Sequence, residues 1–263
     1  MHLGDGAITA ECALIAAGAA AVGLGVAAVA ARSAPPSPRK LLLAGGLGSL
    51  IFAAQAVNLP ILPVSSAHLV GGVLLAWALG PGLAVWTMAA VLLLQAALLG
   101  DGGFHALGAN VLNMALLPAA MLAGWRRFSN QPQVGPAQAA VIAALAIPLA
   151  ALLIVGETAL LRGAAELGPW PDFARRMLAV HLWIGALEGV ATFGLIHALV
   201  RMGAAKPTSI GNENAAWRPA LLMFAAAIVL PILAYPISSR LPDGLEWAAE
   251  SSGLKILDAA PRE

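Results

Sequence analysis

The chain contains stretches of about 20 residues in which apolar and small side chains follow one another without a charge, such as 12–31 and 136–156. A helix needs about 20 such residues to cross the hydrocarbon layer of a membrane. Apolar residues make up 60% of the 263 residues and charged residues only 10%, whereas a soluble domain has about 25% charged residues. The sequence therefore predicts an all-α fold, a polytopic helix bundle in a membrane.

We predict eight membrane segments, seven of which form a core while the eighth is an appended transmembrane helix. They cover residues 11–31, 41–58, 68–80, 83–100, 109–125, 136–161, 177–200 and 217–235. The third segment is short, follows Pro60 and Pro63, and ends at Gly80-Pro81-Gly82. A half-buried helix is therefore an alternative to a full span at that place.

The predicted organisation has three parts: a transmembrane core over 1–200, a cytoplasmic linker over 201–216, and over 217–263 a transmembrane helix with an extracytoplasmic tail. Basic residues gather in three loops on one side, namely Arg32, Arg39, Lys40, Arg126, Arg127, Arg201, Lys206 and Arg218. Because basic loops stay in the cytoplasm, we expect a multi-pass protein of the cell inner membrane with both termini outside. A net charge of +1 gives no reason to expect nucleic acid as a partner.

The start of the chain is the strongest candidate for a metal site. Cys12 is the only cysteine, so nitrogen or oxygen atoms must hold any metal. The amine of Met1, the Met1–His2 peptide nitrogen and the His2 ring can close two adjacent chelate rings in one plane. A fourth nitrogen would complete a square-planar site, which favours Ni(II) or Cu(II). His68 is predicted on the same membrane side and is a candidate for this donor, although it could instead cap helix carbonyls.

Further polar residues are candidates to orient these ligands as a second shell. They are Asp101, His105, Asn110, Asn113, His181 and Glu188. Asn110 and Asn113 are three residues apart and would share a helix face, where they could instead tie helices together. His181 and Glu188 are two helical turns apart in the seventh segment, and an interhelical hydrogen-bonding role is the alternative for them.

Several motifs together resemble a known family. The start MHLGDG, the stretch PVSSAHLVGG around His68 and the segment LQAALLGDGGFHALGANVLNM are similar to nickel/cobalt substrate-binding components of energy-coupling-factor (ECF) transporters, the NikM and CbiM group. The tail LPDGLEWAAESSG resembles the PDGLE module of the small NikN-type accessory component. The resemblance implies that the amine of Met1, the backbone and ring nitrogens of His2 and the ring of His68 bind the metal.

The same resemblance implies a transporter component and not an enzyme, with Ni²⁺ or Co²⁺ as cargo and no resident cofactor. The chain has no P-loop motif for ATP, so the implied partners are two cytoplasmic ATPase subunits and a transmembrane coupling subunit. Two alternatives remain. One is a secondary metal carrier coupled to protons through Glu188, and the other is an intramembrane metal-dependent enzyme that uses His181 and Glu188, although HExxH and GxSxG motifs are absent. The fused tail favours nickel over cobalt.

Overall fold

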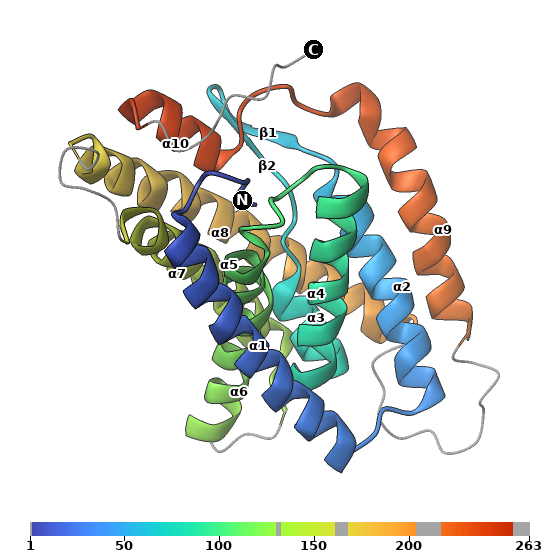
Figure 1. Cartoon of the computed structure of the whole chain (residues 1–263). Coiled ribbons are helices and arrows are strands. Elements are labelled where there is room, and N and C mark those ends of the chain that lie inside the picture. The colour runs from blue at the N-terminus through green and yellow to red at the C-terminus, as the bar shows by residue number, and fades with distance from the viewer. Residues whose placement is uncertain (1, 130–132, 161–167, 204–216, 255–263) are drawn as a thin grey trace.

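The protein is a bundle of helices with one short β-hairpin, as Figure 1 shows. The computed structural model describes residues 2–129, 133–160, 168–203 and 217–254. The helices within this part are α1 Ala10–Ser33, α2 Pro38–Gln55, α3 Gly72–Leu79, α4 Pro81–Leu98, α5 Leu107–Val111, the π-helix η1 Leu112–Leu116, α6 Leu117–Phe128, α7 Pro136–Ala159, α8 Trp170–Arg201, α9 Trp217–Ala234, the 3₁₀ turn η3 Tyr235–Ile237 and α10 Gly244–Ser252. The hairpin consists of β1 Leu59–Leu62 and β2 Ser65–Ala67, which pair antiparallel.

Six helices in the described part of the chain are long and apolar enough to cross a membrane. They are α1, α4, the continuous helix formed by α5, η1 and α6, α7, α8, and α9 with η3. Large apolar side chains such as Leu14, Val22 and Val190 point outward from these helices and are exposed, as expected where lipid is the solvent. The predicted all-α membrane bundle is confirmed.

The third predicted segment, 68–80, is not a full span. Its helix α3 has only eight residues, too few to cross the hydrocarbon layer, so the half-buried alternative is correct. α3 lies in the centre of the bundle against α2, α4, α6, α7 and α8, where Leu74 and Leu75 are fully buried. His68 therefore precedes this helix in an irregular segment between β2 and α3.

The seventh predicted segment begins earlier than its apolar run. α8 starts at Trp170 rather than at residue 177, because Asp172 in its first turn binds both Arg175 and Arg176, each at 2.6 Å. These ion pairs one turn apart support a charged extension that hydropathy alone does not detect. Most of the predicted linker, residues 204–216, lies outside the described residues.

One end of the bundle gathers the start of the chain, the hairpin and α10 (Figure 1). Ser66 of β2 binds the tail twice, because its N–H donates to the Pro242 carbonyl at 2.8 Å and its hydroxyl to the Leu241 carbonyl at 2.8 Å. The N–H of Ser239 donates to the carbonyl of Asn58 at 2.7 Å. α10 then packs against α8. The tail is thus fixed to the loops at this end.

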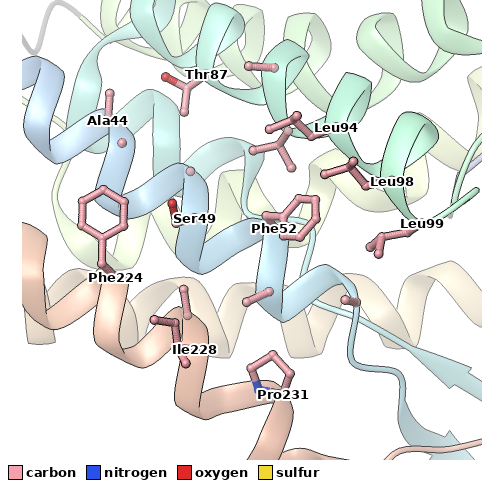
Figure 2. A pocket seen from close by; sticks show the side chains of 17 residues that line it. Ala44, Ser49, Phe52, Thr87, Leu94, Leu98, Leu99, Phe224, Ile228 and Pro231 are labelled. Carbon is pink, nitrogen blue, oxygen red and sulfur yellow. The ribbon is translucent and has the colours of Figure 1, made fainter.

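An apolar groove of about 810 Å³ lies between α2, α4 and α9 (Figure 2). Phe52 of α2, Leu94 and Leu98 of α4, and Phe224 and Ile228 of α9 line it. Beside this groove α9 approaches α2 closely at Gly46 of α2, which faces the backbone of Ala220. Small residues permit such close contacts between membrane helices.

Candidate metal centre

Hydrogen bonds to the backbone of Leu3 hold the chain segment that follows His2 in the protein. Asn110 accepts the N–H of Leu3 at 2.8 Å and donates its amide to the Leu3 carbonyl at 3.0 Å. The N–H of Gly103 donates to the same carbonyl at 2.9 Å, and the Leu3 side chain is fully buried. A side chain at Gly103 would collide with Asp5, so glycine is required where the 101–103 loop meets the N-terminal segment.

This clamp places His2 beside His68. The two rings are stacked with centroids 5.1 Å apart and planes 14° apart, and the residues are only 8% and 9% exposed. The Nδ1 atom of His2 lies 3.1 Å from Oδ1 of Asp101, and Nδ1 of His68 lies 3.2 Å from the Leu69 carbonyl. Nε2 of His2 is buried and has no hydrogen-bond partner among the described residues.

The charges at this cluster suit a cation. Burial lowers the pKa of His68 to about 3, so its ring is neutral at physiological pH and its nitrogen lone pair is available. Burial raises the pKa of Asp101, but the hydrogen bond with His2 and the positive charges nearby outweigh that effect, so the pKa of this carboxyl lies below its ordinary value. A histidine ring hydrogen-bonded to a carboxylate is a common arrangement around protein-bound metals.

The loop that carries His68 is held from two other helices. The carboxylate of Glu188 on α8 accepts the N–H groups of Val70 and Gly71 at 2.9 and 2.7 Å. Gln55 at the end of α2 donates its amide to the Val70 carbonyl at 2.7 Å. Sequence reasoning missed Gln55, although a buried amide at the end of an apolar helix could have indicated a structural or binding role.

Three of the predicted second-shell residues have other partners, although His181 also lines a small pocket together with His68. His105 is exposed and its ring lies 3.6 Å from Asp5. Asn113 donates to the carboxylate of Glu157 on α7 at 2.8 Å. His181 binds the Met177 carbonyl of its own helix at 2.8 Å. Asp101, Asn110 and Glu188 do contact the histidines or the segments that carry them.

The side chains of Asn110 and Asn113 do not point to the same face of their helix, as they would in a regular α-helix. The π-helical turn η1 begins between them at Leu112, and an extra residue in a turn rotates the side chains that follow it. Pro118 lies just beyond this turn, and a proline within a helix crowds the preceding turn. Asn110 therefore faces the N-terminal segment, while Asn113 faces α7.

His181 and Glu188 do not contact each other, since each has the separate partners described above. His181 is instead covered by the tail, because a side chain placed on Gly244 would come within 3.0 Å of its ring. Nε2 of His181 is buried without a hydrogen-bond partner in the described part of the chain. The acid–base pair that an intramembrane enzyme would need is thus not assembled in this arrangement.

A polar cavity of about 340 Å³ opens beside His68. Its lining residues come from the end of α2 and the segment before β1, from the segment after β2, from the loop after α4, and from the tail. They are Gln55, Ala56, Asn58, His68, Leu99, Asp101, Asp243 and Glu246.

Within residues 2–129, 133–160, 168–203 and 217–254, no three His, Cys, Asp or Glu side chains form a group that could hold a metal ion directly. Met1, the remaining predicted ligand, lies outside the described residues.

Fold and site together define an integral membrane protein with a candidate transition-metal site at one end of its bundle. Residues 2–205 match CbiM, the cobalt uptake substrate-specific transmembrane region. The chain belongs to the CbiM family, and the predicted resemblance to the NikM and CbiM group is confirmed.

Relatives and solved structures agree with this assignment. A putative fused nickel transport protein NikMN of Archaeoglobus fulgidus is 33% identical over 233 residues, which cover 81% of this chain and 71% of the relative. A fused nickel transport protein NikMN of Rhodobacter capsulatus is 34% identical over 165 residues, or 57% of this chain and 48% of the relative. The crystal structure of a truncated transition metal transporter is similar with a TM-score of 0.66 and 27% identity, covering 76% of this chain and 99% of the other.

Proposed function

We propose that this protein is the substrate-binding component of an ECF-type transporter that takes up Ni²⁺, with Co²⁺ as the second candidate. Its proposed partners are a transmembrane coupling subunit and two cytoplasmic ATPase subunits, because the sequence carries no P-loop of its own. The proposed orientation places both termini, and hence the metal site, on the extracytoplasmic side.

Four nitrogens would bind the metal in a plane: the amine of Met1, the peptide nitrogen and ring of His2, and the ring of His68. Closing a six-membered chelate ring from the His2 peptide nitrogen uses Nδ1 of its ring. This is the atom that contacts Asp101 at 3.1 Å. Asp101 would therefore yield this atom to the metal and remain beside it as a negative charge.

The observation that carries the proposal is the stacking of His2 and His68, which are 66 positions apart in sequence and have ring centroids 5.1 Å apart. Two buried imidazole rings side by side can offer nitrogen donors to one ion. A shared metal ion fits membership of the CbiM family.

Equilibrium dialysis of the purified protein against Ni²⁺ and Co²⁺ tests the site. The parent should bind one metal ion per chain, and His2→Ala or His68→Ala should lose high-affinity binding because each removes one of four donors. His197→Ala is the matched control, since His197 is exposed on α8 and contacts the carbonyl and the ring of Phe193 in its own helix. Parental affinity in His68→Ala would reject the assignment of the fourth donor.

Nickel uptake by whole cells tests the energy source. We expect accumulation only when the coupling subunit and both ATPase subunits are expressed together with this protein. Accumulation by the chain alone would instead support the secondary-carrier alternative.

A further inference from the structure

The fully buried ring of His181 has one nitrogen for which the described residues provide no partner. Its Nδ1 lies 2.8 Å from the Met177 carbonyl, and a carbonyl oxygen can only accept, so Nδ1 carries a proton. A buried ring is neutral because burying a charge is costly, which makes Nε2 its acceptor. Nε2 is buried without a hydrogen-bond partner in the described part of the chain. A donor beside this atom would therefore stabilise the arrangement.

Nε2 of His181 faces the first turn of the tail helix α10. A side chain on Gly244 would place its Cβ 3.3 Å from Nε2 and 3.0 Å from Cε1 of the His181 ring. Gly244 is the first residue of α10, and the first N–H groups of a helix have no partner within it. The tail therefore brings a backbone donor close to the buried acceptor.

The small pocket that His181 shares with His68 lies between α8 and the tail. His181 and Ile184 of α8 line it, together with Asp243 and Gly244 of the tail and with His68. Its volume of about 10 Å³ is close to the smallest that holds one water molecule, about 10–15 Å³. The described His and Asp side chains form no group of three that could hold a metal ion. The pocket therefore suits a water molecule and not a second ion.

We infer that one water molecule occupies this pocket and joins His181 to the start of α10, so that His181 is a positioning residue for the proposed nickel ligand His68. The water accepts the N–H of Gly244 and donates one hydrogen to Nε2 of His181. Its second hydrogen can reach the carboxylate of Asp243, which offers several acceptor sites. These contacts provide the two to four polar partners that a buried water needs. The inference rests on the proposed function, since it concerns the orientation of a proposed metal ligand.

The tail also holds the segment before His68. The N–H and the hydroxyl of Ser66 donate to the carbonyls of Pro242 and Leu241, each at 2.8 Å. Glu188 of α8 holds the segment after His68. A tail fixed to α8 therefore supports this ligand loop on its other side, and both supports lead to the same helix.

The nickel affinity of the full-length protein in detergent, measured by equilibrium dialysis, tests this link. His181→Leu keeps an apolar side chain of similar size but removes the acceptor, so affinity should fall about tenfold, the low end for residues that support metal ligands. His181→Gln should retain most of the parental affinity, because its amide oxygen lies about as far from the backbone as Nε2. His197→Leu is the control, since His197 also contacts the carbonyl four residues earlier in α8, at 2.9 Å, but is exposed.

Gly244→Ala tests the same link from the side of the tail. Its methyl group enters the space beside Nε2 and displaces the water, while alanine itself favours a helix. We expect a loss of affinity like that of His181→Leu and no further loss when the two changes are combined, whereas independent effects would multiply.

Three results would overturn the inference: multiplied losses in the combined variant, parental affinity in His181→Leu, or a loss in His181→Gln or His197→Leu as large as in His181→Leu. Absence of nickel from the parent at equilibrium would instead reject the proposed function.

Discussion

The carboxylate of Glu188 in α8 accepts the backbone N–H of Gly71 at 2.7 Å, at the start of α3. The first N–H groups of a helix have no partner within it, and Gly71 provides no side-chain cap. Glu188 also accepts the N–H of Val70 at 2.9 Å and so caps α3 from another helix. Because Val70 is two residues after His68, this cap also fixes the loop that carries the predicted ligand.

Glu188→Gln should loosen that loop. A glutamine can accept through one oxygen only, so one buried N–H loses its partner, at a cost of about 1–3 kcal/mol of stability. We expect a lower thermal unfolding temperature and about tenfold to hundredfold weaker nickel binding, the range typical of residues that orient metal ligands. Thr192→Val, one turn further along α8, is the control, because the Thr192 hydroxyl has no partner among the described residues. Equal affinities of Glu188→Gln and the parent would show that the cap does not position His68.

A residue added ahead of Met1 should abolish nickel binding although every side chain remains. The addition converts the amine of Met1 into an amide and moves the free terminus away from the His2 ring, so the chelate rings cannot close. A tag at the C-terminus should leave binding intact. Nickel content per purified chain is the measurement, with intact mass confirming each terminus. Equal metal in the two proteins would leave a site made of the two histidine rings alone.

Asn110→Ala should separate His2 from His68. The Leu3 N–H loses its partner, whereas the Leu3 carbonyl keeps the N–H of Gly103, and an unpaired buried donor costs about 1–3 kcal/mol. We expect nickel affinity to fall at least tenfold in dialysis. Asn113→Ala is the matched control, since this asparagine lies three residues later and binds Glu157 on α7. Similar losses in both variants would indicate general destabilisation of the helix.

A chain that ends at Ser238 should still bind one nickel but should load it more slowly. This truncation keeps α9 and its packing against α2 while it removes α10 and the bonds from Ser66 to Leu241 and Pro242. We expect nickel uptake by cells to fall most at low external nickel, where capture limits the rate. Uptake at the parental rate across all concentrations would dismiss a role for the tail.

The sequence by itself determined the class of the protein and much of its helical plan. Long charge-free stretches leave few alternatives to membrane helices, since only a helix satisfies its own backbone in lipid. The segment 136–161 accordingly corresponds to α7, Pro136–Ala159. The motifs around His2 and His68 were sufficient to indicate the family, which residues 2–205 confirm. The assignment of Met1, His2 and His68 as ligands remains a prediction.

Only the tertiary structure decided which polar residues meet. Asp101 and His105 lie in the same loop, yet Asp101 contacts His2 whereas His105 faces Asp5 at the surface. Glu188 pairs with Val70, which is 118 positions away. Periodicity along a helix predicts which face a residue occupies, but it contains no information about which distant loop packs against that face. Those contacts follow from how the bundle folds around the short helix α3, because a buried polar group must find its partner wherever packing brings one within reach.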